Sequence, residues 1–237
     1  FVLPTVPSLK TDFVYVGEHA AHWASRVGCT LSSAQLAQHY SANAQEHRVT
    51  LRAQNEFPGP DPLRWNDRAH LETSIADRLA NGVTTFAVPE TLRRNPAVLA
   101  QADAFLRTSM AHDRVFCQIA AEPPPATWPE ITELCKQWNG TAPHIPLMAT
   151  TFGYGPFLSD EVDIWAVNSA IFDTDNNQRL LERIRNGHET WLYVNRFNAR
   201  PYANFLLDFA AIEHRVFFWQ AWALGIKGIH YWAINYA

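Results

Sequence analysis

The stretch "VFCQIAAEPPPATWPEITELCKQW", residues 115–138, decides the fold of this chain. An apolar run over 115–122 has the character of a buried strand, three prolines close it, and a helical pattern follows over 127–138. The same order of strand, turn and helix recurs along the chain. Because strands that alternate with helices form parallel βαβ units, the stretch predicts an α/β protein.

The sequence holds eight candidate strands, most of them separated by helical patterns. They cover residues 13–17, 48–55, 83–90, 115–122, 145–151, 162–169, 190–196 and 228–235. Gly82, Gly187 and Gly225 follow helical runs, where C-terminal caps belong. The crossover over 152–161 is short and leaves room for a turn or two of helix. Eight units in 237 residues predict a single (β/α)8 TIM barrel spanning residues 1–237.

An open, doubly wound sheet is the alternative fold for such an alternation. That fold usually carries a glycine-rich phosphate loop after its first strand. Here "VGEHAAHW", residues 16–23, follows the first strand, and neither GxGxxG nor GxxxxGKS occurs anywhere in the chain. The barrel is therefore favoured.

The composition argues against nucleic-acid and membrane partners. The formal net charge is −4, and no basic stripe with interleaved aromatic residues is present. No apolar run approaches the roughly 18 residues that a membrane-spanning helix needs. We therefore expect no nucleic acid and no membrane among the partners of this chain.

Metal and cofactor motifs are also missing. The three cysteines are odd in number and widely spaced, so they form neither a disulfide framework nor a CxxC motif. The ten histidines form no HExxH, and Glu18, His19 and His22 make only a loosely spaced cluster. The sequence thus predicts no metal and no organic cofactor.

The two ends of the chain suggest a piece of a longer protein. It begins at Phe1 rather than at a methionine, and it ends in "HYWAINYA" without a closing helix. We expect flanking domains outside this sequence. No signal peptide opens the chain, and a secreted or periplasmic location would need a signal upstream, so the compartment stays open.

Polar residues close nearly every predicted strand, at the end of the barrel where TIM-barrel active sites form. They are Glu18, His19, Gln54, Asn55, Glu56, Glu90, Glu122, Thr150, Thr151, Asn168, Asn195, Arg196, Asn235 and Tyr236. Any one of them is explained by contact with water. As a set they predict a functional mouth, because the strands are apolar up to their last one or two positions.

Glu122 is the strongest catalytic candidate among these residues. Pro123 cannot donate to a sheet, so the strand ends at the glutamate, on a rigid base suited to a general acid. Glycoside hydrolysis usually needs a second carboxylate. Glu18, Glu56, Glu90 and Asp173 are the possible partners, and the sequence does not choose among them.

Aromatic and amide side chains near the strand ends suit the faces and hydroxyls of a sugar. We predict a glycan-binding mouth lined by Glu18, Glu56, Glu90, Asn168, Tyr193, Asn195, Trp232 and Asn235. Trp191 and Trp219 lie inside apolar stretches, so we expect both in the core. The apolar helical pattern over 204–225 is likewise expected to pack tightly.

The C-terminal segment "YANFLLDFAAIEHRVFFWQAWALGIKGIHYWAINY", residues 202–236, resembles glycoside hydrolase family 123 and the related domain of unknown function 4091. The shared features are an Ala-Ile-Glu-His-Arg run, a Trp-Gln-Ala-Trp helix and a Gly-x-x-Tyr-Trp strand. "VDIWAVNS", "WLYVNRFNARPYAN" and "LPTVPSLKTDF" resemble earlier parts of the same family. The resemblance spans nearly the whole chain and is most specific in its last fifth.

This resemblance implies a β-N-acetylgalactosaminidase activity on a (β/α)8 barrel. In the family, the 2-acetamido oxygen of the sugar attacks the anomeric carbon, assisted by an adjacent Asp-Glu pair at the end of strand four. The glutamate, the general acid/base, corresponds to Glu122, and the aspartate corresponds to Ala121. No metal or organic cofactor is implied, and a β-sandwich usually precedes the barrel.

Alanine at position 121 departs from the family pattern, because it cannot accept the acetamido N–H or balance positive charge. Losing such an electrostatic partner can cost on the order of 10²–10³ in rate. The sequence leaves open a changed substrate, a degenerate sugar binder and an engineered inactivation. The expected function is hydrolysis of N-acetyl-β-hexosaminides, and the alternative is a non-catalytic carbohydrate-binding barrel.

Overall fold

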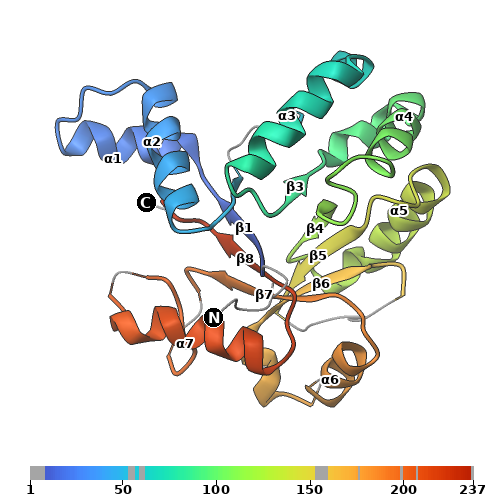
Figure 1. The fold of residues 1–237 in the computed structure, drawn as a ribbon. Helices are drawn as coiled ribbons and strands as arrows, with labels where there is room; N and C mark the ends of the chain where they lie inside the picture. The colour runs from blue at the N-terminus through green and yellow to red at the C-terminus, as the bar shows by residue number, and fades with distance from the viewer. Residues whose placement is uncertain are drawn as a thin grey trace, which may run out of the picture.

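A computed structural model describes residues 9–52, 57–58, 62–152, 160–175, 177–197, 200–206 and 208–235. Eight parallel strands form one curved sheet in the order β2-β1-β8-β7-β6-β5-β4-β3, with helices on its outer side (Figure 1). The sheet closes almost completely. This architecture confirms the predicted (β/α)8 barrel.

The elements alternate along the chain as strand and helix, except that β6 follows β5 with no helix among the described residues between them. The strands are β1 Lys10–Val14, β2 Leu51–Arg52, β3 Phe86–Ala87, β4 Val115–Ala121, β5 Leu147–Thr151, β6 Ile164–Asn168, β7 Thr190–Asn195 and β8 Gly228–Trp232. The α-helices are α1 Gly17–Arg26, α2 Ser33–Glu46, α3 Arg68–Ala80, α4 Pro96–Leu106, α5 Trp128–Thr141, α6 Asn177–Arg185 and α7 Ala211–Ala223. Short 3-10 helices are η1 Pro62–Asn66, η2 Glu90–Arg94, η3 Pro125–Thr127 and η4 Ser169–Asp173.

The first three strands differ from their predicted bounds. The first was expected over 13–17, but β1 covers Lys10–Val14 and α1 already begins at Gly17. The prediction was wrong because Thr11 and Asp12 look like loop residues, yet both are buried and hydrogen-bonded. In the part of the chain that the structure describes, β2 covers Leu51–Arg52 and β3 covers Phe86–Ala87, whereas residues 53–55 of the second predicted strand lie outside it.

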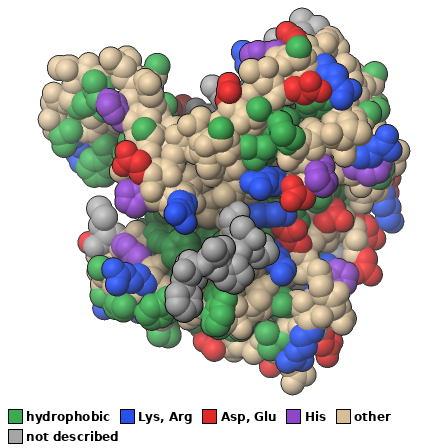
Figure 2. Space-filling view, in the orientation of Figure 1, with side chains coloured by type: hydrophobic (Ala, Val, Ile, Leu, Met, Phe, Trp, Pro, Cys, Tyr) green, Lys and Arg blue, Asp and Glu red, His purple; other side chains and the backbone are tan. Residues whose placement is uncertain are grey.

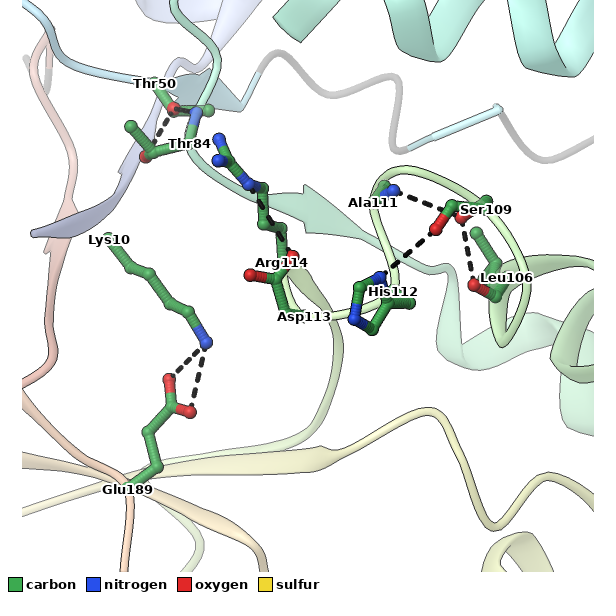
Figure 3. A network of polar contacts seen from close by, with 10 residues as sticks. All are labelled: Lys10, Thr50, Thr84, Leu106, Ser109, Ala111, His112, Asp113, Arg114 and Glu189. Carbon is green, nitrogen blue, oxygen red and sulfur yellow. Dashed lines mark hydrogen bonds and ion pairs between the residues drawn. The ribbon is translucent and has the colours of Figure 1, made fainter. Parts of the chain in front are cut away.

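Threonine side chains join the two ends of the strand order, where β2 and β3 approach each other. The Thr84 N–H donates to Thr50 Oγ1 over 2.7 Å, and the Thr50 N–H donates to Thr11 Oγ1 over 2.8 Å. Figure 3 shows the Thr50–Thr84 contact beside the start of the strands. Side chains thus replace part of the backbone pairing at this seam.

The strands have an inner and an outer face, as alternation along each strand requires. In β6, Trp165 and Val167 belong to the outer core that helices α3 to α6 cover, whereas Ile164 and Ala166 belong to the inner cluster. The rest of the inner cluster is Ala87, Phe116, Met148, Trp191 and Tyr193. The barrel interior is therefore packed, and a ligand has to bind at its mouth.

The N-terminal end of the barrel is packed around the side chain of Trp191, which is 1% exposed. Its Nε1–H donates to Glu189 over 2.7 Å. Figure 3 shows the ion pair that Lys10 forms with the same carboxylate at 2.9 Å. A Cβ atom at Gly228 would lie 2.4 Å from the indole ring of Trp191. Only glycine fits there, so this end of the barrel serves stability.

The predicted helix ends agree with the structure, whereas the predicted burial of helix α7 does not. Gly82, Gly187 and Gly225 have φ values of +81°, +84° and +72°, which confirms them as caps. Trp191 is buried as expected, but Trp219 is 61% exposed on α7, so its predicted core position is wrong. No helix among the described residues is long and apolar enough to cross a membrane.

The helical pattern over 204–225 is also shorter than expected. Helix α7 begins only at Ala211, and Asn204, at the start of the predicted pattern, uses its side chain for bonds to the backbone. Its Nδ2 donates to the Asn195 carbonyl over 2.8 Å, and its Oδ1 accepts the Phe205 N–H over 2.6 Å. Such side-chain bonds compete with helix formation.

Helices α1 and α2 form a lobe beside the barrel. Few of their side chains are buried: Ala20 and Ala24 in α1, and Ala44 in α2. Figure 2 shows this lobe separated from α3 by a deep notch in the surface. Helix α1 follows the C-terminal end of β1, and α2 leads back to the start of β2.

Candidate functional site

Glu122 follows the last residue of β4, at the C-terminal end of the barrel. The pairing of β4 with β5 shifts between Gln118 and Ala120, which marks a β-bulge. Ile119 and Ala120 consequently both pack against the outer core, although neighbours in a strand normally alternate. The bulge changes the phase of the strand, so Ala121 takes an inward position at the mouth, where it is exposed.

The backbone of Glu122 is in the left-handed region, with φ of +49°. Arg48 is the only other non-glycine residue with a positive φ among the described residues. The Glu122 N–H donates to the Thr150 carbonyl over 3.1 Å and lies 3.2 Å from Thr150 Oγ1. A strained residue held in this way by its neighbour strand is a feature that clusters at functional sites.

Two donors from β7 hold the carboxylate of Glu122. The Tyr193 hydroxyl donates to Oε1, and Asn195 Nδ2 donates to the same oxygen over 2.7 Å. Asn195 Nδ2 also lies 3.0 Å from the Tyr193 hydroxyl. Oε2 of Glu122 receives no hydrogen bond from any residue that the structure describes, so one carboxylate oxygen is available to a ligand.

The amide of Asn195 is oriented by the backbone that follows it. Its Oδ1 accepts the Phe197 N–H over 2.9 Å, which leaves Nδ2 as the atom that faces Glu122. Asn204 Nδ2 donates to the Asn195 carbonyl and fixes the end of β7. The donor to the glutamate is therefore positioned before any ligand arrives.

Tyr193 is a neutral hydrogen-bond donor. Burial raises the pKa of its phenol far above the usual range, and the hydrogen bond to Glu122 and the charge of that carboxylate raise it further. The ring is 4% exposed. It lies between His230, with ring centroids 5.4 Å apart, and Phe152, at 6.0 Å.

The structure brings together Glu122, Tyr193 and Asn195 from the predicted site. Asn168 is the strand neighbour of Tyr193 and is 2% exposed; its Oδ1 accepts the Ala170 N–H over 3.0 Å. Its Nδ2 has no hydrogen-bond partner among the described residues. Asn168 thus lies at the same end of the barrel, one strand away from the Glu122 contacts.

Trp232 and Asn235 lie at the end of β8. Trp232 pairs with Asn195 across the strands and packs against the inner cluster. Asn235 uses both amide atoms on the backbone of Val16: its Oδ1 accepts the N–H over 2.9 Å and its Nδ2 donates to the carbonyl over 2.7 Å. Asn235 therefore ties β8 to the start of α1.

The other predicted carboxylates have separate surroundings. Glu18 is exposed on α1, and Glu90 forms an ion pair with Arg93 within η2. Asp173, at the end of η4, accepts a hydrogen bond from Tyr202, which raises the pKa of that phenol. Glu56 lies outside the described residues. The described residues contain no group of three His, Cys, Asp or Glu side chains that could hold a metal.

A polar cluster that the sequence analysis missed lies inside the barrel. It consists of Asp12, Arg52, Gln118 and His230, from β1, β2, β4 and β8. The available signal was a single polar residue inside an apolar strand, as in "VFCQIAA" and "GIHYW". The strand that holds Asp12 was expected to begin one residue after it.

A separate pocket of about 460 Å³ lies on the outer side of the barrel, between α2 and strands β1 and β8. Tyr40, Phe205 and Tyr231 contribute to its apolar lining, and Trp232 and Arg196 also line it. Glu122 and the two donors to its carboxylate, Tyr193 and Asn195, are not among the residues that line this pocket. We place the candidate site at the mouth because the buried donors converge there.

The fold and the mouth define a (β/α)8 barrel with an oriented carboxylate at the end of its fourth strand. The sequence matches no protein-family model and no curated protein. Among solved structures, one similar chain is a zinc-bound amidohydrolase from Burkholderia ambifaria. It is 11% identical, with a TM-score of 0.34, over 96% of this chain and 75% of the other. This likeness is too weak to bear on function.

Proposed function

We propose that this chain is the catalytic barrel of a glycoside hydrolase that acts on N-acetyl-β-hexosaminides, with Glu122 as general acid and base. The observation that supports the proposal is the Glu122 carboxylate at the mouth, bound on Oε1 by Tyr193 and Asn195, with no hydrogen bond to Oε2 from the described residues. The resemblance of residues 202–236 to glycoside hydrolase family 123 supplies the substrate class.

The geometry suits proton transfer from one oxygen of Glu122. Two neutral donors occupy Oε1, so in the acid form the proton resides on Oε2. As the bond from the anomeric carbon to the leaving oxygen breaks, that proton passes to the leaving oxygen. A positioned acid of this kind contributes about 10²–10⁴ in rate.

The nucleophile in this proposal belongs to the substrate. The 2-acetamido oxygen forms a bond to the anomeric carbon and gives a cyclic oxazolinium intermediate. Water then adds to the anomeric carbon, the Glu122 carboxylate takes the water proton, and the bond to the acetamido oxygen breaks. This route is one of the exceptions to the scheme with two enzymatic carboxylates.

Ala121 limits the rate in this scheme. Its inward, exposed position leaves open space where a carboxylate would accept the acetamido N–H. Without it, the positive charge of the intermediate is not balanced at this position, which can cost on the order of 10²–10³ in rate. We therefore expect slow turnover in the protein as it stands.

The test is a gain of activity. Ala121→Asp is expected to raise hydrolysis of an aryl N-acetyl-β-galactosaminide by about 10²-fold, as the lost electrostatic partner returns. Ala121→Asn is the matched control, because it has nearly the same shape without the charge, and we expect it to restore much less. Glu122→Gln should abolish turnover in both backgrounds. Unchanged hydrolysis in Glu122→Gln would refute the assigned mechanism.

Ala121 also favours a second candidate, a non-catalytic carbohydrate-binding barrel. In that case the wild-type chain would bind N-acetylhexosaminides, measured by calorimetry, without turnover. Glu122→Gln would retain the binding, and Ala121→Asp would gain no hydrolysis. These outcomes separate the binder from the enzyme.

A further inference from the structure

Four polar side chains form a connected group inside the barrel, beneath the mouth. The His230 Nδ1–H donates to Asp12 Oδ2 over 2.7 Å, and an Arg52 terminal nitrogen lies 3.2 Å from the same oxygen. That nitrogen also donates to Gln118 Oε1 over 2.7 Å. Asp12 is 1% exposed and His230 is 2% exposed.

Stability alone does not account for this group. Taking Asp12 and Arg52 out of water has a desolvation cost that the attraction between them only partly offsets. Apolar side chains of similar volume would fill the same space at least as well. The group also occupies a particular place, since His230 is the strand neighbour of Tyr193.

The charge states give the cluster a fixed arrangement. Burial raises the pKa of Asp12, but Arg52 and the hydrogen bond from His230 lower it more, so the carboxyl is ionised. Burial lowers the pKa of His230, and the contact with Asp12 only partly opposes this. At neutral pH the imidazole is therefore neutral, with its proton on Nδ1, directed at Asp12.

The face of His230 lies against the ring of Tyr193. Their centroids are 5.4 Å apart with an interplanar angle of 30°. Phe152 contacts Tyr193 at 6.0 Å and 60°. The hydroxyl of the ring held between them is the donor to Glu122 Oε1.

We propose that His230 is a positioning residue for this site: Asp12 orients its ring, and the ring holds Tyr193 with its hydroxyl on Glu122. The effect on Tyr193 follows from the geometry alone. Its consequence for catalysis rests on the proposed function. Arg52 completes the arrangement by contacting Asp12, and Gln118 accepts a hydrogen bond from Arg52.

The test uses His230→Asn, because the Asn side chain can still donate to Asp12 but removes the ring face. The hydrogen bond of Tyr193 is observed in the full chain by NMR of tyrosine ¹³C-labelled at Cζ. Tyr193→Phe assigns the signal among the seven tyrosines, and Glu122→Ala gives its position without the acceptor. We expect the signal in His230→Asn to move toward the Glu122→Ala position.

His144→Asn is the matched control. His144 Nδ1 also contacts a buried aspartate, Asp103, over 2.8 Å, but this pair lies in the outer layer between α4 and the segment before β5. The control should leave the Tyr193 signal unchanged. An unchanged signal in His230→Asn as well would overturn the proposal.

Kinetics provide an independent reading. Misplacement of a group at the reacting centre lowers kcat, so we expect His230→Asn to reduce kcat about 10–100-fold, with KM within about twofold. A shifted Tyr193 signal in a protein without any hydrolase activity would uphold the positioning role and refute the proposed function. If His230→Asn does not fold, the ¹³Cζ signal of Tyr193 is measured in Asp12→Asn instead. A shift toward the Glu122→Ala position supports the proposal, and an unchanged position refutes it.

Discussion

The left-handed backbone of Glu122 predicts an unusual order of stability between two substitutions. Glu122→Gly and Glu122→Ala both remove the carboxylate, so Tyr193 and Asn195 lose the same acceptor in each. The two variants then differ by a single Cβ atom at φ of +49°. Their comparison isolates the backbone strain from the loss of the side-chain hydrogen bonds.

The magnitude follows from two opposing terms. A Cβ atom in the left-handed region costs about 1–2 kcal/mol, whereas glycine in an extended position is normally worse than alanine by about 0.5–1 kcal/mol because of its entropy. We therefore expect Glu122→Gly to have a free energy of unfolding about 1 kcal/mol higher than that of Glu122→Ala, which corresponds to a Tm about 2–4 °C higher for a chain of this size. The usual order is thus reversed.

Urea unfolding followed by tryptophan fluorescence measures the difference, provided that the two variants share the same m-value. The control is the preceding residue, Ala121, which does not have a positive φ. Ala121→Gly should lose about 0.5–1 kcal/mol, the ordinary sign. A Glu122→Ala protein as stable as Glu122→Gly would refute the strain assigned to this residue.

Two further predictions concern the barrel interior. Gly228→Ala should destabilise the fold by about 1–3 kcal/mol, because the new Cβ would meet the Trp191 ring. The control is Gly140→Ala in α5, which should be neutral or stabilising because a Cβ there meets nothing within 4 Å. Equal urea midpoints for the two variants would contradict this prediction. The pKa of His230 is lowered in the folded state, so the unfolded chain binds more protons below about pH 6.5. The free energy of unfolding must therefore fall as the pH falls through that range, by at most about 2 kcal/mol at pH 5. His230→Asn should lose less stability than the wild type between pH 7 and pH 5 in urea titrations, and an equal loss would argue against a neutral buried imidazole.

Much of the architecture could be predicted because it depends on local patterns. The strand over 115–122 and the helix over 127–138 were found from apolar periodicity and prolines, and the structure has β4 and α5 there. Glu122 was found because a proline ends its strand. Each of these signals comes from neighbours within a few residues in the chain.

Contacts between distant residues could not be predicted in the same way. Asp12 and His230 are 218 residues apart, and only the closure of β1 against β8 brings them together. The bulge in β4 depends on its pairing with β5, which the sequence of β4 does not encode. Trp219 was misplaced because an apolar pattern does not tell whether another element covers that face of α7.

The sequence by itself determined the alternation of strands and helices, the barrel, and a glutamate at the end of the fourth strand. These follow from periodicity and from the backbone limits of proline. Only the tertiary structure decided that Tyr193 and Asn195 bind Glu122, that its backbone is left-handed, and that His230 and Asp12 lie beneath it. The reason is physical: hydrogen bonds and ring contacts act over a few ångströms in space, and distance along the chain does not reveal them.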